Sequence, residues 1–321
     1  MNQNTAFIAD NSAGVRSISV SSPFIPTLLD TYDPGSIIDV YGKTNYVFLG
    51  DTSGTDELIA INATNPSNLA ETDQLNFDIM TGLFVDGNYA YVAGERSSAS
   101  DSGLVIVDIT DPANIFRTGQ VDTTDPRDVF GRGNYAYFAD GTSGAKVIDV
   151  TNKAAPAIRG TVNTTGSGEG IFVDGNYAFV ADGSNGLVII DIANPLSISI
   201  TGSYNTPGTA HNVFVDGNYA FVADGTSLLK IDISNKAAPT LSRTYVTPYT
   251  FYDVSIRNNI GYIAAGAMGL IVLDLTNGTR IENARAAANS FIDFNGWTMP
   301  PDQIGLASFN TSATTDHNLT S

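Results

Sequence analysis

A unit of about 42 residues recurs along the chain, and this repetition limits the available folds more than any other feature. The segment "NYAFVADGSNGLVIIDIANP" begins at Asn176, and "NYAFVADGTSLLKIDISN" begins at Asn218. Seven copies align on a central aromatic residue, at spacings of 41 to 46 residues: Phe7, Phe48, Tyr91, Tyr137, Phe179, Phe221 and Tyr262. A repeat of this length is one supersecondary unit that buries its apolar face against the next copy.

Each unit has the pattern of four β-strands. In one copy, the apolar segment "GIFV" (170–173) leads through "DGN" (174–176), a tight hairpin turn, to the alternating segment "YAFVAD" (177–182). The continuous apolar segment "LVIIDI" (187–192) and "SISITGSY" (197–204) follow. Four antiparallel strands in this period predict a propeller blade, whereas the recurring Gly and Pro and the lack of a 3.6-residue period exclude a helical solenoid.

The third strand of the unit resembles a known family. "GLVIVDI" (103–109) and "GLVIIDI" (186–192) resemble the LVIVD-repeat family of β-propellers, and the resemblance extends over roughly residues 4–280. It implies a propeller fold and a protein that is often secreted or on the cell surface. We therefore expect an all-β, seven-bladed β-propeller of four-stranded antiparallel blades in residues 1–296, followed by a C-terminal extension in residues 297–321.

The two ends of the chain are expected to share one blade. The chain begins at the second strand of its first unit, so that this blade lacks an inner strand. The segment "SFIDFNG" (290–296) lies where the spacing of the earlier units places the next inner strand. This C-terminal strand is predicted to close the first blade, which leaves no open sheet edge within the ring.

Charge and hydropathy exclude several functions. The net charge is −18, with 33 acidic against 15 basic residues, which disfavours nucleic acid and anionic lipid surfaces. The sequence contains no run of about 20 apolar residues, so it does not predict a membrane-spanning segment. The start "MNQNTAFIAD" lacks the basic and apolar segments of a signal peptide, and the chain has no Cys for disulfides.

Two sets of aspartates recur at fixed positions before turns, and we expect both sets to accept backbone hydrogen bonds there. The first set ends the third strand of five units: Asp108, Asp149, Asp191, Asp232 and Asp274. The second set ends the second strand: Asp10, Asp51, Asp140, Asp182 and Asp224.

A third set lies nine residues before the central aromatics, at the start of the inner strands: Asp39, Gly82, Asp128, Gly170, Asn212 and Asp253. Inner strands converge on a central channel, so these side chains should surround one mouth of it. Asp39, Asp128 and Asp253 could then bind calcium, which prefers oxygen ligands. The alternative is that each aspartate caps its own loop, and the two glycines argue against a symmetric ring of ligands.

Loops on the same face as these strand starts vary most between units, and variable loops commonly carry binding sites. "PYTFY" (248–252) concentrates three aromatics, which could contact protein or sugar, or could pack as a plug. The candidate ligand-binding set is Asp128, His211, Asn212, Tyr249, Phe251, Tyr252 and Asp253. We assign no catalytic residue, because there is no GxSxG motif and His211 would need partners from distant blades.

The function most consistent with these features is a non-enzymatic surface or extracellular protein, acting in adhesion or as a subunit of a self-assembled structure. Its expected partners are proteins, including copies of itself through residues 297–321, and glycans; calcium is the one cofactor considered. Five Asn-x-Ser/Thr sequons are candidate glycosylation sites: Asn62, Asn163, Asn277, Asn310 and Asn318. The alternatives are a metal-dependent enzyme that uses the channel mouth and a cytoplasmic protein-interaction platform.

Overall fold

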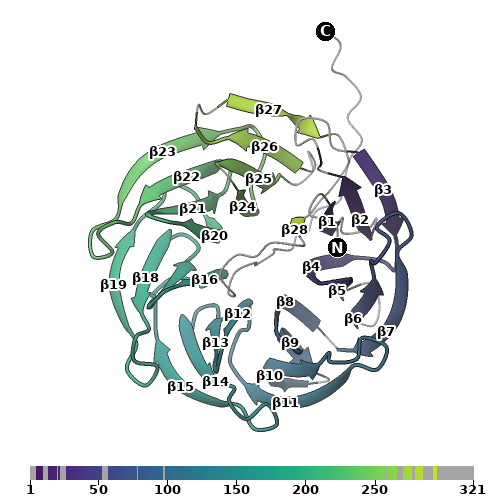
Figure 1. Ribbon diagram of the computed structural model, residues 1–321. Coiled ribbons are helices and arrows are strands. Elements are labelled where there is room, and N and C mark those ends of the chain that lie inside the picture. The colour runs from purple at the N-terminus through teal and green to yellow at the C-terminus, as the bar shows by residue number, and fades with distance from the viewer. Residues whose placement is uncertain are drawn as a thin grey trace.

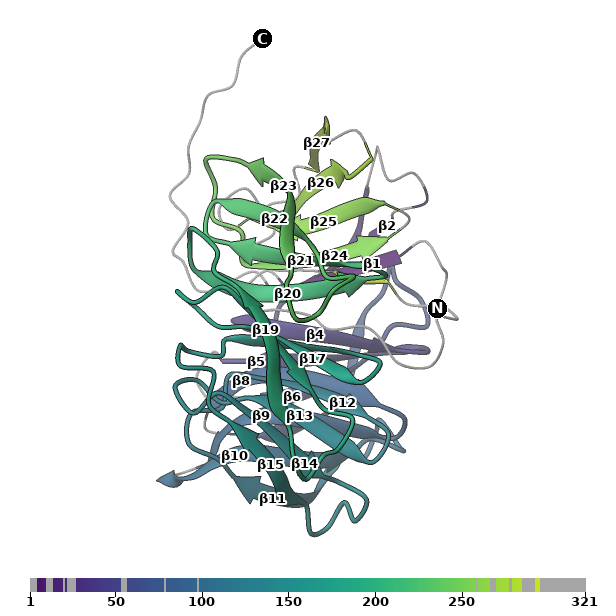
Figure 2. The same ribbon diagram turned by 90° about the vertical axis from the view of Figure 1, so that its left-hand side faces the viewer.

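A computed structural model describes residues 5–9, 14–19, 21, 27–52, 57–77, 79–96, 98–257, 259–265, 270–276, 279–284 and 292–294. Within these ranges every regular element is a β-strand. The strands form seven four-stranded antiparallel sheets that are arranged around a central axis (Figure 1). Figure 2 shows the same ring from the side. The chain is therefore an all-β propeller with four-stranded antiparallel blades, as the repeats predict.

We number the sheets along the chain and give their strands from the channel outward. Sheet 1 contains β28 (Ile292–Phe294), β1 (Thr5–Ala9), β2 (Val15–Ser19) and β3 (Thr27–Tyr32). Sheet 2 contains β4 (Ile37–Lys43), β5 (Tyr46–Asp51), β6 (Glu57–Asn62) and β7 (Ala70–Asn76). Sheet 3 contains β8 (Ile79–Asp86), β9 (Tyr89–Arg96), β10 (Ser98–Asp108) and β11 (Phe116–Asp122).

The remaining four sheets follow the same order. Sheet 4 contains β12 (Asp128–Arg132), β13 (Tyr135–Ala139), β14 (Ala145–Asp149) and β15 (Ala157–Val162). Sheet 5 contains β16 (Gly170–Asp174), β17 (Tyr177–Ala181), β18 (Leu187–Asp191) and β19 (Ser199–Tyr204). Sheet 6 contains β20 (Ala210–Asp216), β21 (Tyr219–Asp224), β22 (Ser227–Asp232) and β23 (Thr240–Val246). Sheet 7 contains β24 (Asp253–Arg257), β25 (Ile260–Ala264), β26 (Leu270–Asp274) and β27 (Thr279–Ala284).

The aspartates that end the third strands hold the turns that follow them, as expected. Asp191 Oδ1 accepts a hydrogen bond from the Ala193 N–H at 2.9 Å. The same contact, to the N–H two residues later, is made by Asp108, Asp149, Asp232 and Asp274. Asn62 occupies this position in sheet 2 and accepts from the Thr64 N–H. Each turn therefore carries its own side-chain cap, which starts the outer strand at the same place in each of these sheets.

Aromatic side chains form the centre of the core. The seven aromatics that define the repeat are each at most 6% exposed. On the inner strands a second aromatic series passes from sheet to sheet: Tyr41, Phe84, Phe130, Phe172 and Phe214, with successive ring centroids 5.1, 4.5, 5.3 and 4.9 Å apart. These tilted ring contacts hold neighbouring inner strands against one another around the channel.

Outer strands lie close to the turn of the following sheet, and glycine permits this approach. A Cβ added to Gly202 of β19 would collide with the carbonyl oxygen of Lys236, which lies in the turn after β22. Gly119 of β11 and Gly160 of β15 face the turns of the next sheets in the same way. The packing between sheets therefore includes backbone contacts that no side chain can replace.

Replacing Gly202 with alanine should lower the free energy of unfolding by about 1–3 kcal/mol, because the added methyl group forces two sheets apart. Gly261→Ala is the matched control, since its Cβ would make an ordinary 3.4 Å contact with Leu275, and five of the other six repeats carry alanine at this position. Urea unfolding of the two variants measures the difference. Equal stability of both would contradict the close approach of β19 to the next sheet.

The two ends of the described chain meet in sheet 1. β28 pairs with β1 in antiparallel register, with Phe7 opposite Asp293. Figure 1 shows β28 beside β1, at the channel end of the sheet. This is the pairing that the strand spacing predicts. The proposed extension, residues 297–321, lies outside the described residues. No helix in the described ranges is long and apolar enough to cross a membrane.

Candidate functional site

The starts of the inner strands surround one mouth of the central channel, so residues at the same repeat position form rings. We call the first ring the inner ring; it contains Asp39, Gly82, Asp128, Gly170, Asn212 and Asp253. The residue before each of these forms a second ring: Ile38, Thr81, Arg127, Glu169, His211 and Tyr252. Side chains of the second ring are half-buried or exposed.

Two aspartates of the inner ring bridge neighbouring sheets. Asp39 Oδ1 accepts from the Val40 N–H at 2.8 Å, and its Oδ2 accepts from the Leu83 N–H in the next sheet at 2.8 Å. Asp128 repeats this arrangement with the N–H groups of Val129 and Ile171, both at 2.8 Å. These contacts favour the structural alternative, in which the aspartates accept backbone hydrogen bonds. They differ from it in one respect, because each aspartate also accepts from an N–H of the adjacent sheet.

The glycines of the inner ring have a packing reason. A Cβ on Gly82 would lie 3.0 Å from the Cα and 3.1 Å from the Oδ1 of Asp128 in the next sheet. A Cβ on Gly170 would lie 3.0 Å from the Oδ1 of Asn212. These two glycines therefore give the side chains of Asp128 and Asn212 the space they need beside the preceding strand.

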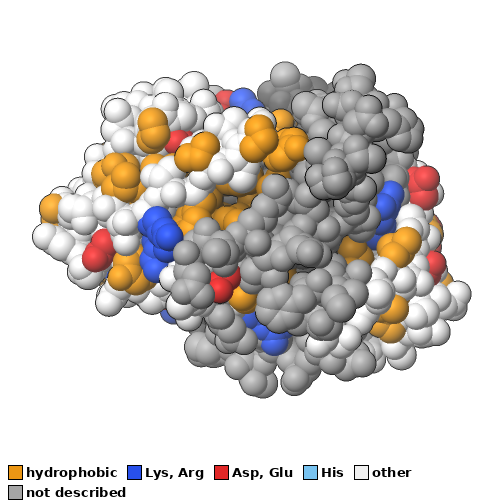
Figure 3. Space-filling view, turned by 90° about the horizontal axis from the view of Figure 1, so that it is seen from above, with side chains coloured by type: hydrophobic (Ala, Val, Ile, Leu, Met, Phe, Trp, Pro, Cys, Tyr) orange, Lys and Arg blue, Asp and Glu red, His pale blue; other side chains and the backbone are white. Residues whose placement is uncertain are grey.

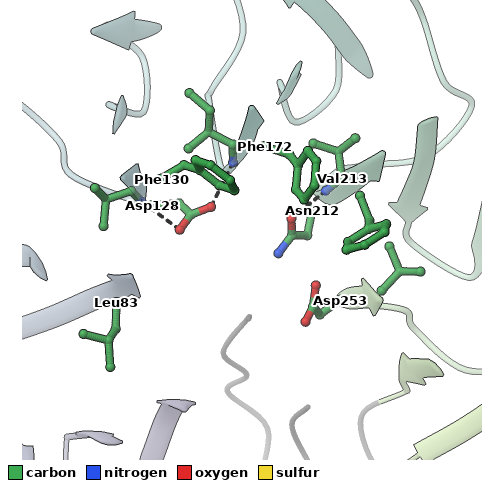
Figure 4. Close-up of a pocket in the computed structure, with 11 residues that line it drawn as sticks. Leu83, Asp128, Phe130, Phe172, Asn212, Val213 and Asp253 are labelled. Atoms are coloured by element: carbon green, nitrogen blue, oxygen red, sulfur yellow. Dashed lines mark hydrogen bonds between the residues drawn. The ribbon is translucent and has the colours of Figure 1, made fainter. Parts of the chain in front are cut away.

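A hollow at the channel wall collects the polar residues of three inner strands. Figure 4 shows Asp128, Asn212 and Asp253 around it, with Phe130 and Phe172 beside them. Its lining residues are Leu83, Asp128, Val129, Phe130, Ile171, Phe172, Asn212, Val213, Phe214, Asp253 and Val254. The hollow thus brings two carboxyl groups and one amide together beside apolar and aromatic side chains.

Burial raises the pKa of two carboxyl groups of the inner ring. It brings the pKa of Asp128 to about 7. The pKa of Asp39 lies well above its usual value because of burial first, then because of the negative charges of Asp128 and Asp253. The charges of Asp128 and Asp253 therefore act on Asp39 across the channel.

The metal prediction stays open. Among the described residues, no group of three or more His, Cys, Asp or Glu side chains is arranged to hold a metal ion. A calcium site at Asp39, Asp128 and Asp253 remains a prediction, and the backbone donors already occupy one direction at each oxygen of Asp39 and Asp128.

Asp128→Asn should change how stability depends on pH. An unfolded aspartate titrates near pH 3.9, whereas folded Asp128 titrates near 7. The contribution of Asp128 to the free energy of unfolding is therefore fully present below about pH 4 and is lost as pH rises through 7. The slope is about 1.4 kcal/mol per pH unit between those values. Asparagine cannot ionise, and Asn212 already occupies the equivalent position in sheet 6.

We therefore expect the Asp128→Asn variant, which loses one acceptor, to be less stable than the parent at pH 5 and to recover relative to it by pH 8. Thermal unfolding at both pH values measures this. A stability difference that does not change with pH would contradict the raised pKa.

Four consecutive side chains of the second ring form an arc, and we call Arg127, Glu169, His211 and Tyr252 the mouth residues. Arg127 Nη1 lies 3.8 Å from Glu169 Oε2, and its Nε lies 2.9 Å from Asp125 Oδ1. Ser167 Oγ donates to Glu169 Oε1 at 2.7 Å. The arc therefore begins with a charged pair that its neighbours orient.

The other half of the arc consists of two rings. The His211 and Tyr252 ring centroids are 5.3 Å apart with an interplanar angle of 44°. Burial lowers the pKa of His211 and outweighs the negative charges of Glu169 and Asp224, which act to raise it. His211 is therefore a neutral imidazole at pH 7, with one nitrogen that donates and one that accepts. The structure thus brings together two residues that the sequence analysis selected separately.

Phe251 requires a correction. Its side chain is 0% exposed, and its N–H donates to the Gly225 carbonyl. A side chain buried to this extent cannot contact a ligand at the surface, so Phe251 belongs to the core, as the packed-plug alternative expects. Tyr249 is half-buried and packs against the same core. Only Tyr252 of this loop lies among the mouth residues.

Sequence reasoning did not select Arg127 and Glu169. The signal that could have found them is the position itself, because the residue before the inner ring changes chemistry in every unit whereas the inner ring after it contains only Asp, Gly and Asn. Of the sequons, Asn62 is half-buried and Asn163 is exposed, where its Oδ1 accepts from the Thr165 N–H. Asn277, Asn310 and Asn318 lie outside the described residues.

Comparisons with known proteins agree with this architecture. A family model described as LVIVD repeat matches residues 81–123, 125–164, 165–206 and 207–247, which correspond to sheets 3 to 6. A search of curated proteins gives no match.

Solved structures resemble the fold at low sequence identity. The Pseudomonas aeruginosa periplasmic gluconolactonase PpgL has a TM-score of 0.73 at 10% identity, over 88% of this chain and 95% of that one. Apo AztD from Citrobacter koseri has a TM-score of 0.57 at 17% identity, over 86% and 84%. The computationally designed Ika8 protein has a TM-score of 0.67 at 10% identity, over 96% and 94%. At these identities the likeness concerns the fold alone.

Proposed function

The chain belongs to the LVIVD-repeat family, and on that premise we propose that it is a non-enzymatic surface or extracellular propeller that binds a partner at its channel mouth. In this proposal the seven sheets are the seven blades of one closed ring, joined by β1 and β28. The ring serves as a rigid scaffold, and the mouth residues make the contacts that support adhesion.

One observation carries the binding proposal. Arg127, Glu169, His211 and Tyr252 occupy the same repeat position and yet have four different chemistries. The residues that follow them serve packing and backbone hydrogen bonds. In these units the residue after the varied position is Asp, Gly or Asn, and the one after that is aliphatic, as packing of similar units requires. The varied position itself is therefore free to serve recognition.

The hydrogen bonds of the inner ring favour a non-enzymatic role over a metal-dependent enzyme. Both oxygens of Asp39 and of Asp128 accept backbone N–H groups, which commits these carboxylates to joining sheets. The test is thermal unfolding of the full chain with calcium, with chelator, and with sodium chloride at matched ionic strength. We expect one melting temperature throughout; a rise with calcium alone would favour the metal site and overturn this part of the proposal.

Location is tested separately. Fractionation of the source cells, with antibody detection on intact and lysed cells, should place the protein in the external or surface fraction. Attachment of glycans to Asn62 or Asn163 would be detected by mass spectrometry of the same material. Protein found only in the cytosol would favour the cytoplasmic interaction platform and contradict the surface proposal.

Self-assembly is the second candidate, and the outer strands favour it. Ile158, Ile200 and Leu241 occupy the same position of β15, β19 and β23 and are 38, 44 and 45% exposed. Figure 3 views the ring from the side of β23 and shows hydrophobic side chains there, whereas β15 lies on the far side of the ring (Figure 1). An outer strand can pair with an added strand, and residues 297–321 of a second copy are the proposed donor.

Light scattering of the full chain and of a chain ending at residue 296 tests the assembly. We expect oligomers or filaments of the full chain and monomers of the shortened one, because a donated strand is a heterologous contact. If both are monomers at high concentration, assembly through residues 297–321 is wrong.

A further inference from the structure

We propose that the mouth residues bind a neutral saccharide, with Tyr252 and His211 under one face of a sugar ring and with Arg127 and Glu169 at its hydroxyl groups. This inference rests on the proposed binding function and names its ligand class. It follows from the charges, hydrogen-bonding groups and rings that meet at the mouth.

The charge of the mouth disfavours an anionic ligand. Arg127 is engaged by Asp125 at 2.9 Å and lies 3.8 Å from Glu169, so two carboxylates already oppose its single positive charge. His211 is neutral at pH 7 because burial lowers its pKa. With a net charge of −18 on the whole chain, a phosphate, sulfate or sialic acid would approach a negative surface.

A strongly cationic ligand is disfavoured by a different feature. The carboxylates below the mouth do not present free charge, since Asp128 accepts two backbone N–H groups and its pKa is raised to about 7. Glu169 is shared between the Ser167 hydroxyl and Arg127. These acidic groups are therefore partly neutralised or already hydrogen-bonded. The charges at the mouth thus favour a neutral ligand over an anionic or a strongly cationic one.

The polar groups suit hydroxyls. Arg127 and Glu169 carry planar groups with several donors or acceptors, which can contact two neighbouring hydroxyl groups at once. His211 adds one donor and one acceptor. The hydrogen bonds from Ser167 to Glu169 and from Arg127 to Asp125 fix two of these groups before a ligand arrives, which lowers the entropy cost of binding.

The two rings suit the apolar face of a sugar. His211 and Tyr252 are tilted by 44° at a centroid distance of 5.3 Å, so they form the two sides of a shallow aromatic surface. Both side chains are half-buried, which leaves part of each ring accessible at the mouth. Sugars combine C–H groups on one face with hydroxyls at the edge, and this matches rings beside planar polar groups.

The position in the fold suggests how far such a ligand enters. The hollow is lined by Asp128, Asn212 and Asp253, and Phe172 lies beside them (Figure 4). The hollow has a volume of about 10 Å³, which is room for about one water molecule, so we expect the sugar to bind at the mouth residues rather than to enter the hollow.

The experiment uses the purified full chain on an array of neutral, sialylated and sulfated glycans, followed by calorimetry with the best neutral ligand. Tyr252→Ala and Glu169→Ala should each weaken binding at least about tenfold, which corresponds to about 1.4 kcal/mol. Tyr252→Phe keeps the ring and should stay within about threefold of the parent. Tyr135→Ala, a half-buried tyrosine at the other end of its sheet, is the matched control and should not change binding.

Thermal unfolding of every variant confirms that it is folded. Absence of binding to every neutral glycan, preference for sialylated or sulfated glycans, or unchanged affinity of Tyr252→Ala would each overturn the saccharide inference. None of these results would decide the proposed surface function, which fails instead if the protein is found only in the cytosol.

Discussion

Replacing Asp140 with alanine should lower the free energy of unfolding by about 3–5 kcal/mol, because it leaves the charge of a buried lysine without its partner. Asp140 is 0% exposed and forms an ion pair through Oδ2 with Lys146 Nζ, and Lys146 is 7% exposed. Asp140 also accepts from the N–H groups of Thr124 and Asp125. Burial already lowers the pKa of Lys146, so this side chain depends on the carboxylate for its charge.

Lys146→Val is the informative control, and it should change stability by less than about 1 kcal/mol. Sheets 5 and 6 carry Val188 and Leu229 at the equivalent position and keep the equivalent buried aspartate. There a threonine hydroxyl contacts the carboxylate instead, as Thr206 does with Asp224 at 2.6 Å.

In sheet 4 the equivalent Thr123 Oγ1 is buried without a hydrogen-bond partner. It can turn to Asp140 when the lysine is removed. Guanidinium unfolding of both variants measures the difference between their free energies of unfolding. A loss of stability in Lys146→Val as large as that in Asp140→Ala would contradict this account.

Removal of residues 290–321 should lower the melting temperature by on the order of 10 °C, whereas removal of residues 297–321 should leave it nearly unchanged. The longer deletion removes β28, which supplies the inner strand of sheet 1. β1 then has an unpaired edge at the channel, and its neighbour β4 loses a packing surface. Calorimetry of the two shortened chains measures the difference.

The shorter deletion controls for general effects of truncation, because it removes the extension and keeps β28 intact. Equal melting temperatures for the two shortened chains would show that the β1–β28 pairing does not hold the ring together. A large loss from the shorter deletion alone would instead show that residues 297–321 stabilise the propeller.

The features that repeat were predictable from the sequence. Four-stranded sheets follow from the period, and the turn caps at residues such as Asp191 follow from aspartate before each turn. Closure was predictable because one unit lacked a strand and "SFIDFNG" lay at the expected spacing. Each of these arguments uses residues that are close in sequence or related by the repeat.

Contacts between units were not predictable in the same way. Asp39 and the Leu83 N–H are 44 residues apart, and the sequence does not show which sheet face each one lies on. The same reason explains the error at Phe251, where an aromatic loop suggests exposure and only the packing of neighbouring sheets reveals burial. Arg127 and Glu169 went unselected because reasoning from repeats directs attention to residues that recur.

Pairing of β1 with β28 also sets the order in which the protein can be completed. β1 is made before every other strand of the ring, and its partner at residues 292–294 is made after all of them. At synthesis rates of 5–20 residues per second, β1 waits roughly 15 to 60 s with one edge unpaired. Sheets 2 to 7 can assemble from contiguous chain in that interval, but sheet 1 cannot. The nascent ring therefore stays open until residues 292–294 have left the ribosome, and β1 is the strand that most needs protection from misplaced pairing.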